Sequence, residues 1–227
     1  MYRYETHLHT SPVSACARAS VYDSLAAYRE LGYDGVFLTN HFLDANICRD
    51  VRHLPYAEQL EFYYSAYLEA RELQDKIGIK VFFGTELGYK HADFLVYGLD
   101  IDWYRQHPEI IGMPKKEELR LMRESGAFIV HAHPFREASF IEYIRLFPRD
   151  VDAVEIFNAS RTEGENKMAE LYCRHYGLLE FAGTDNHVAL GRTLFSGMEC
   201  EYPIETDGDF IRAMRAGDMR VFSIERK

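Results

Sequence analysis

Histidine and carboxylate side chains recur just after hydrophobic runs in this chain. The first group is Thr6-His7-Leu8-His9-Thr10, at the end of an expected strand. Side chains two residues apart in a strand lie on the same face, so His7 and His9 can point at one object while Leu8 points into the core. Two imidazoles directed at one place suggest a metal ion, although a histidine pair on a strand is by itself more often structural or solvated.

Four further groups of polar residues occupy the same kind of position. They are Asn40-His41, Glu86, His131-Ala132-His133-Pro134 and Asp185-Asn186-His187. Imidazole and carboxylate are ligands that suit zinc, manganese and iron. Taken together, the candidate ligands are His7, His9, His41, Glu86, His133, Asp185 and His187. Because these seven groups exceed the needs of one four-coordinate zinc ion, we expect two or three divalent ions (Zn, Mn or Fe) and a bridging carboxylate.

Such a cluster is suited to hydrolysis. Paired metal ions about 3.5–4 Å apart can activate a water molecule and stabilise both the attacking and the leaving oxygen of a phosphoryl displacement. The sequence therefore predicts catalysis by a metal-bound water held by Glu86 and Asp185, and it gives no indication of redox chemistry or group transfer.

Three arginines follow the candidate ligands closely. Arg136 comes three residues after His133, Arg161 three after Asn158, and Arg192 five after His187. A guanidinium group can bind two phosphate oxygens at once, so these side chains are candidates for binding a substrate phosphate. Each of them could instead pair with a surface carboxylate.

The elements that must position these residues alternate along the chain. Strands are expected at 3–9, 35–39, 79–86, 93–98, 127–130, 151–156, 178–182 and 220–223, and helices at 21–31, 56–77, 115–124, 140–147, 163–176 and 207–216. Alternating strands and helices imply parallel pairing with the helices outside. Seven or eight such units close more naturally into a barrel than into an open sheet, and barrels of this kind build their sites at the C-terminal ends of the strands.

Composition limits the classes of function. With 47% hydrophobic residues and no Pro-, Gly- or Ser-rich linker, residues 1–227 are expected to form a single domain. The net charge of −10 argues against general nucleic-acid or membrane-surface binding. The four cysteines have no C-x-x-C spacing and follow no secretory signal, so reduced thiols and a cytoplasmic location are expected. Neither familiar glycine-rich nucleotide loop is present in the sequence.

The ordered motifs resemble those of the PHP family, named for polymerase and histidinol phosphatase. They are His7-Leu8-His9, Thr39-Asn40-His41, Gly84-Thr85-Glu86, Ala132-His133-Pro134-Phe135-Arg136, Glu155-Ile156-Phe157-Asn158 and Gly183-Thr184-Asp185-Asn186-His187. The resemblance implies a distorted TIM-like (β/α)7 barrel with a di- or trinuclear centre at the strand C-termini. It also implies one metal held by His7, His9, Glu86 and Asp185, a second shared by Glu86 and His133, and a third held by His41 and His187.

The chain departs from the family pattern at two positions. Many members carry another histidine or an aspartate in the loop after the first motif, where this chain offers only Cys16. A thiolate suits zinc, whereas a lone loop cysteine is more often a bystander. Members also often place a histidine on the strand after the glutamate motif. Here Asp93 can replace that ligand, while His91 lies two positions earlier, in the region of a turn.

Three other polar residues leave alternatives open. His131 is expected on the same strand face as His133. Glu155 and Asn158 could orient a ligand or the substrate, or could be purely structural.

The sequence thus predicts a metal-dependent phosphoesterase whose partner is a small phosphorylated metabolite or nucleotide. Two alternatives remain open at this point. One is a protein-tyrosine phosphatase or exonuclease of the same family. The other is a metal-binding regulatory domain that has lost catalysis. The oligomeric state cannot be read from the sequence.

Overall fold

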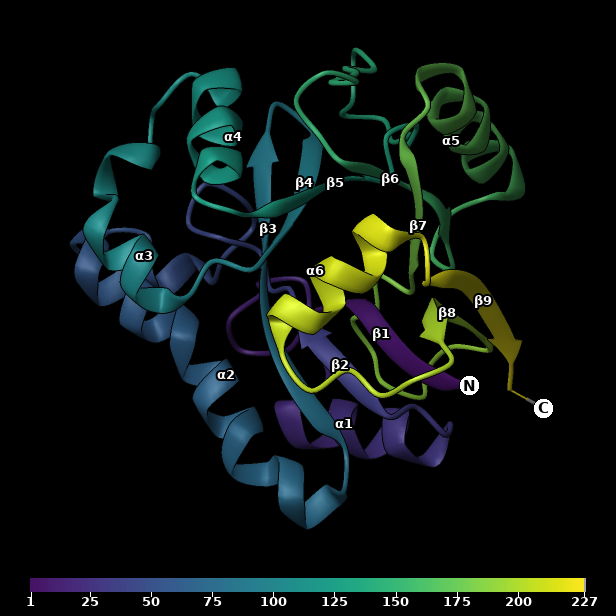
Figure 1. The fold of residues 1–227 in the computed structure, drawn as a ribbon. Coiled ribbons are helices and arrows are strands. Elements are labelled where there is room, and N and C mark those ends of the chain that lie inside the picture. The colour runs from purple at the N-terminus through teal and green to yellow at the C-terminus, as the bar shows by residue number, and fades with distance from the viewer. Residues whose placement is uncertain (227) are drawn as a thin grey trace.

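A strongly curved mixed sheet forms the centre of the protein in the computed structural model, which describes residues 1–226 (Figure 1). Its strands lie in the spatial order β7-β6-β5-β4-β3-β2-β1-β8-β9. They are β1 (Tyr2–Leu8), β2 (Gly35–Leu38), β3 (Lys80–Tyr89), β4 (Ala92–Tyr97), β5 (Phe128–Ala132), β6 (Ala153–Asn158), β7 (Leu179–Gly183), β8 (Leu194–Cys200) and β9 (Arg220–Glu225). The segment after β7 returns to the end of β1, where the His9 amide donates to the Asn186 carbonyl at 2.9 Å. Strands β1 to β7 therefore form a nearly closed, distorted barrel.

The pairing within this sheet is mixed, whereas the alternation of strands and helices predicted parallel pairing. β1, β2 and β3 pair in parallel, as do β5, β6 and β7, but β4 is antiparallel to both β3 and β5. The reason is local. Only two residues, Lys90 and His91, join β3 to β4, and a parallel pair needs a much longer crossover. The prediction of parallel pairing is wrong at this strand.

Helices lie around the outside of the sheet, except for the last one, which crosses the middle of the barrel in this view (Figure 1). They are α1 (Val21–Glu30), α2 (Tyr56–Ile77), α3 (Ile101–Gln106), α4 (Lys115–Glu124), α5 (Glu163–Tyr176) and α6 (Asp207–Ala216), with short 3-10 turns at Arg49–Val51 and Pro108–Ile110. Capping boxes begin α5 and α6, and Gly78, with φ 78°, ends α2 in the left-handed conformation that glycine favours. In residues 1–226 no helix has the length and apolar character needed to cross a bilayer.

Helix α6 closes one end of the barrel. The ring of Phe210 contacts Phe37 of β2, Tyr97 of β4 and Phe181 of β7, with centroids 4.4, 5.5 and 6.3 Å away. Arg215 of the same helix donates to the carbonyl of Ala127, just before β5 begins. This end of the barrel is therefore filled with side chains, and the opposite end, where β1 and β5 finish, is left for the polar residues.

Three elements differ from the sequence-based expectation. The segment 140–147 has no regular structure, although its apolar spacing predicted a helix. Its large apolar residues Phe140, Tyr143, Ile144 and Leu146 are exposed. Helices of this length depend on burying an apolar face, and nothing in residues 1–226 covers this one. Helix α3 and strand β8 form where none was predicted; β8 pairs antiparallel with β1 and β9.

Candidate metal centre

His7 and His9 lie at the end of β1 with their Nε2 atoms 3.1 Å apart. Each ring has a partner on its other side. Nδ1 of His7 lies 2.9 Å from Oε1 of Glu155, and Nδ1 of His9 lies 3.0 Å from the Ser14 hydroxyl. If both rings donate through Nδ1, two bare nitrogen lone pairs face each other, which is favourable only with a cation between them. This is the arrangement of two imidazole ligands.

The neighbours of Ser14 fix the direction of its contact with His9. Oδ1 of Asn40 accepts a hydrogen bond from the backbone amide of Thr10 at 2.7 Å, which fixes the orientation of the Asn40 side-chain amide. The Ser14 hydroxyl, 2.8 Å from the same oxygen, must therefore donate to it. Ser14 then accepts from Nδ1 of His9, which leaves Nε2 of His9 without a hydrogen. The sequence did not point to Ser14, because a single loop serine has no distinguishing spacing.

Glu86 of β3 lies at the centre of the cluster. Its Oε1 is 3.2 Å from Nε2 of His7 and 3.3 Å from Nε2 of His133. Its Oε2 is 3.4 Å from Nε2 of His9 and 2.5 Å from Nδ1 of His41. Both oxygens are buried and neither accepts a hydrogen bond of ordinary geometry. A buried carboxylate that accepts no well-formed hydrogen bond is unfavourable, and binding cations would satisfy it.

Asp185 and His133 reach the same point from the ends of β7 and β5. Oδ1 of Asp185 lies 3.5 Å from Nε2 of His9 and 3.7 Å from Nε2 of His7. Asp185 (φ 54°) and His133 (φ 27°) adopt left-handed backbone conformations, which disfavour non-glycine residues by about 1–2 kcal/mol each. Such strain persists where the surroundings hold a functional side chain in place. At Gly183 an added Cβ would lie 2.5 Å from Cβ of His7, so glycine permits this close approach.

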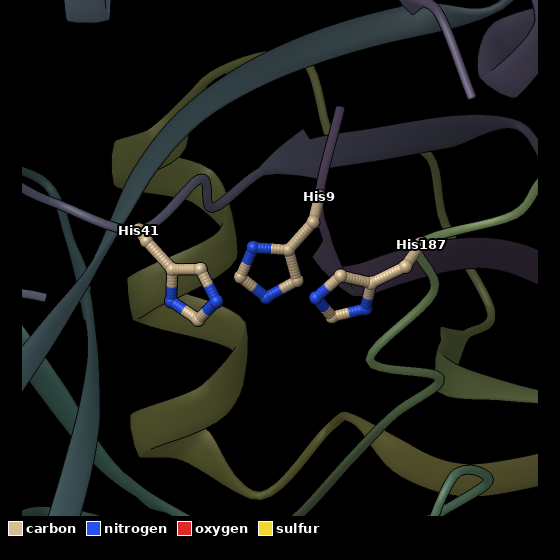
Figure 2. A group of neighbouring side chains, drawn as sticks. All are labelled: His9, His41 and His187. Atoms are coloured by element: carbon tan, nitrogen blue, oxygen red, sulfur yellow. The ribbon is translucent and has the colours of Figure 1, made fainter. Parts of the chain in front are cut away.

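His9, His41 and His187 form a group of three rings on the more exposed side of the cluster (Figure 2). His9 lies between the other two, with its ring centroid 4.3 Å from each. Nδ1 of His187 lies 3.0 Å from the Asp185 carbonyl and donates to it, which frees Nε2. The sulfur of Cys16 lies 3.2 Å from Nε2 of His41, so Cys16 joins this group.

The spacing of the ligand atoms matches that around metal ions. Three sets of ligand atoms each lie within 4.8 Å of one another: His9, His41 and His187; His7, His9 and Asp185; and His7, Glu86 and His133. Atoms bound about 2.0–2.1 Å from a tetrahedral zinc ion stand about 3.3 Å apart, close to most of the distances above. The residues present therefore fit a cluster of divalent cations.

A cleft of about 480 Å³ lies over the cluster, and Asp93, Arg136 and Arg161 line it. Oδ2 of Asp93 is 3.9 Å from Nε2 of His133 and 3.7 Å from Nη1 of Arg136. Nη2 of Arg161 is 3.6 Å from Oδ2 of Asp185. Asp93 thus lies beside the candidate ligands, and two of the three predicted phosphate-binding arginines face the cleft above them.

The third arginine, Arg192, is placed differently. It donates to the carbonyl of Ala159 at 3.0 Å and is not among the residues that line the cleft. Its contact with a substrate phosphate stays a prediction. His131 also stays apart from the cluster, because its ring stacks on Phe94, 5.2 Å between centroids. The positive φ of His133 breaks the strand alternation that predicted a shared face for the two histidines.

Burial and neighbouring charges shift the pKa values in this cluster. Burial alone would lower the pKa of His7, but the surrounding carboxylates, Glu155 foremost, outweigh it and raise that pKa well above its ordinary value. Burial and the adjacent His41 lower the pKa of His9. Burial would raise the pKa of Glu86, but the imidazoles of His41, His7 and His9 hold it well below its usual range. Glu86 is therefore ionised, which is the form that binds a metal ion.

Glu5 supports the cluster from behind and was not singled out from the sequence. Its Oε1 accepts from the amides of Thr6, His7 and Thr184, at 2.9, 2.8 and 3.0 Å. This carboxylate ties β1 to the end of β7, and burial raises its pKa to about 7. A signal was available, since residues 5, 7 and 9 alternate along one strand face.

Comparisons with known sequences give little. No family model matches the chain. An uncharacterized protein of Methanocaldococcus jannaschii is 25% identical over 97 residues, which are 43% of this chain and 53% of that protein. The match thus spans about half the length of that relative, and the description of the relative names no activity.

Solved structures are similar over nearly the whole chain. A two-domain protein from Bacteroides vulgatus, described as containing a predicted PHP-like metal-dependent phosphoesterase, gives a TM-score of 0.64 at 14% identity, covering 97% of this chain and 64% of that one. PsfC from Pseudomonas syringae gives 0.64 at 16% identity, covering 100% of this chain and 93% of that one. An amidohydrolase from Chromobacterium violaceum gives 0.52 at 13% identity, covering 96% and 97%.

These likenesses establish the fold. The chain shares the distorted TIM-like barrel of PHP-like proteins, so the resemblance inferred from the motifs is confirmed at the level of the fold. The chain spans less than two thirds of the Bacteroides protein, which has two domains. That residues 1–227 form a single domain stays a prediction.

Proposed function

We propose that this protein is a metal-dependent phosphoesterase that hydrolyses a small phosphorylated metabolite or nucleotide. The observation that carries the proposal is the placement of Glu86. Its two buried oxygens accept no hydrogen bond of ordinary geometry and lie between the imidazoles of separate ligand groups, which supports a carboxylate shared by two cations. The cleft above it is lined by arginines, which suits an anionic substrate.

The three ligand groups can be filled together only if each nitrogen serves one ion. Nε2 of His7 and Nε2 of His9 each belong to two groups. We assign both to the first ion, with Glu86 and Asp185. Glu86, His133 and Asp93 would then hold the second ion, and His41, His187 and Cys16 would hold the third. Asp93 and Cys16 thus complete the sites that would otherwise lack ligands.

The protein's own residues would do three things for this reaction. Ions bound here would supply the Lewis acidity that lowers the pKa of a water molecule and polarises the phosphoryl group. Glu155 and Ser14 hold the imidazoles of His7 and His9 with Nε2 toward the centre. Arg136 and Arg161 line the cleft beside the candidate ligands, which supports a role for both in binding and orienting the phosphate.

The size of the cleft favours a small substrate. A volume of about 480 Å³ lies in the range of small-molecule pockets, which are roughly 300–1,000 Å³. This makes a phosphoprotein or an oligonucleotide the less favoured alternative. The completeness of the ligand groups likewise disfavours a domain that has lost catalysis.

A second candidate activity is hydrolysis of an amide bond. The amidohydrolase from Chromobacterium violaceum has a similar fold, and activated water at a metal centre can attack a carbonyl as well as a phosphorus atom. The paired arginines of the cleft favour the phosphate ester.

Metal analysis and turnover test this proposal together. Purified protein loaded with manganese or zinc should bind two or more equivalents of metal and hydrolyse a generic aryl phosphate. Replacing two ligands, His9→Ala with Asp185→Ala, should lower that turnover by at least about 100-fold while the circular dichroism spectrum is kept. The matched control is the exposed pair His53→Ala with Asp50→Ala, which should behave as wild type.

Two results would contradict the assignment. One is a metal content of one equivalent or less, which would remove the bridged centre. The other is unchanged turnover in the ligand variant. Hydrolysis of an acyl-amide substrate in place of the phosphate ester, lost in the same variant, would identify the amide activity instead.

A further inference from the structure

The cleft over the metal centre has an aromatic side that the proposed chemistry does not use. His91 and Phe140 line the cleft next to Arg136. Their ring centroids lie 5.3 Å apart with the planes inclined at 56°. We call this pair the aromatic rim. The guanidinium carbon of Arg136 lies 5.6 Å from the centroid of Phe140, so the rim begins one side chain away from a proposed phosphate-binding group.

The rim is not part of the hydrophobic core. Phe140 is 54% exposed, and His91 is exposed as well. An exposed aromatic side chain at the mouth of a polar cleft gains little from its own packing. Exposed apolar groups of this kind commonly mark a site where a ligand binds.

Backbone conformation on the β3–β4 turn gives an independent indication. Lys90 (φ 47°) and His91 (φ 71°) both adopt the left-handed conformation that a two-residue hairpin turn requires. Asn-Gly or Asp-Gly normally occupies such a turn, because other residues are strained there. This chain instead places a histidine there and holds its ring at the cleft. Residues kept in sparsely populated conformations are concentrated at active sites and ligand-binding segments.

Two distant segments of the chain are joined at this place. Arg145, in the irregular segment after β5, donates to the carbonyl of Lys90 at 3.0 Å. The contact holds that segment, which carries Phe140, against the turn that carries His91. The rim is therefore fixed from both sides, although neither segment is buried.

We infer that the aromatic rim binds a flat aromatic group of the substrate, so that the preferred phosphate ester carries an aryl or heterocyclic group close to its phosphate. This inference rests on the proposed phosphoesterase function. Arg136 is the link between the two parts of the site. Its Nη1 faces Asp93 beside the candidate metal ligands, while its guanidinium carbon lies over the ring of Phe140. A phosphate at the arginines would place its ester group against the rim.

Binding of phosphonates to the metal-loaded protein tests the inference without turnover, since their P–C bond is not hydrolysed. The probes are phenylphosphonate, cyclohexylphosphonate and methylphosphonate, measured by calorimetry. Phenylphosphonate should bind about threefold to tenfold more tightly than either other probe. That preference should disappear in Phe140→Ala and in His91→Ala, persist in Phe140→Tyr, and be unaffected in Leu146→Ala, an exposed apolar residue of the same segment that does not line the cleft.

The possible failures are distinguishable. Equal binding of phenyl and cyclohexyl probes would overturn the aromatic rim while leaving the phosphate site intact. If all three probes bind and Phe140→Ala and His91→Ala keep the preference for phenylphosphonate, the aromatic rim is likewise overturned and the phosphate site stands. If no probe binds to protein of confirmed metal content, the proposed phosphate site fails, and the inference fails with it. Circular dichroism and metal content of each variant show that the fold and the centre are retained.

Discussion

At the scale of single residues, Cys16 is the position where this site is most particular to this chain. Its sulfur lies 3.2 Å from Nε2 of His41, and His187 lies on its other side. Burial would raise the pKa of the thiol, but hydrogen bonds with His187 and His41 lower it to about 6. A thiolate beside two imidazoles is a soft ligand set that favours zinc or cobalt over manganese.

Replacing Cys16 by serine should therefore remove one site and leave the rest. We expect Cys16→Ser to lose about one equivalent of metal and to retain two, because the bridged pair uses other ligands. In cobalt-substituted protein, the thiolate-to-cobalt charge-transfer band in the near ultraviolet should be lost. Cys48→Ser, at a half-buried cysteine, is the control. Retention of the band in Cys16→Ser would mean that this sulfur is not a ligand.

At the scale of the elements, the β3–β4 hairpin combines strain with a functional position. Its turn residues Lys90 and His91 take positive φ values without being glycine, which disfavours the fold by about 1–2 kcal/mol for each residue. Strand pairing stabilises the rest of the hairpin, because β4 is hydrogen-bonded to β3 on one side and to β5 on the other. The strain is therefore local to the turn and can be relieved without changing the register.

The double substitution Lys90→Asn with His91→Gly should stabilise the protein by about 1–2 kcal/mol, because this sequence suits the turn. Urea unfolding of the two proteins under identical metal loading measures the difference. The same variant should lose its preference for the phenyl probe, since the His91 ring is gone. A loss of stability would show that the side chains of Lys90 and His91 stabilise the fold by more than their left-handed backbone conformation destabilises it.

At the scale of the whole molecule, α6 links the pH dependence of stability to closure of the barrel. Asp207 begins this helix, and Oδ1 is buried without a hydrogen-bond partner. Burial raises the pKa of Asp207 from 3.8 to about 6. The folded protein then binds more protons than the unfolded chain between these two values. The contribution of this carboxyl to stability is accordingly greatest below pH about 4, falls as the pH rises to about 6, and is absent above.

Asp207→Asn removes this dependence. Between about pH 5 and pH 7.5, the wild type should lose about 1.4 kcal/mol of stability through this carboxyl, and the variant should not. Urea unfolding at the two pH values, each with and without the substitution, isolates the effect from the other titrating groups. The control is Asp209→Asn in the same first turn. The Thr206 hydroxyl lowers the pKa of Asp209, so this substitution should leave the loss of stability between about pH 5 and pH 7.5 as it is in the wild type. An identical pH dependence in wild type and Asp207→Asn would rule out the effect.

Much of the site could be read from the sequence because its ligands follow a rule of position. His7 lies near the end of β1, His9 and His133 come directly after β1 and β5, and strand ends meet at one edge of a barrel. Residues that act through contacts across the fold could not be found in this way. Ser14 holds His9 by a hydrogen bond and has no spacing that marks it out, whereas Glu5, which binds the His7 amide, shares the alternation of residues 5, 7 and 9 along one strand face.

The sequence by itself determined the class of fold and the set of candidate ligands, because periodicity and side-chain chemistry are local properties of the chain. Only the tertiary structure decided the antiparallel position of β4, the irregular segment at 140–147, and which arginines face the cleft. These features depend on turn length, on available apolar surface and on packing between distant residues. The turn that sets the direction of β4 is only two residues long, but its length is known only once both strand ends are placed, and the other two causes involve residues far apart in the chain.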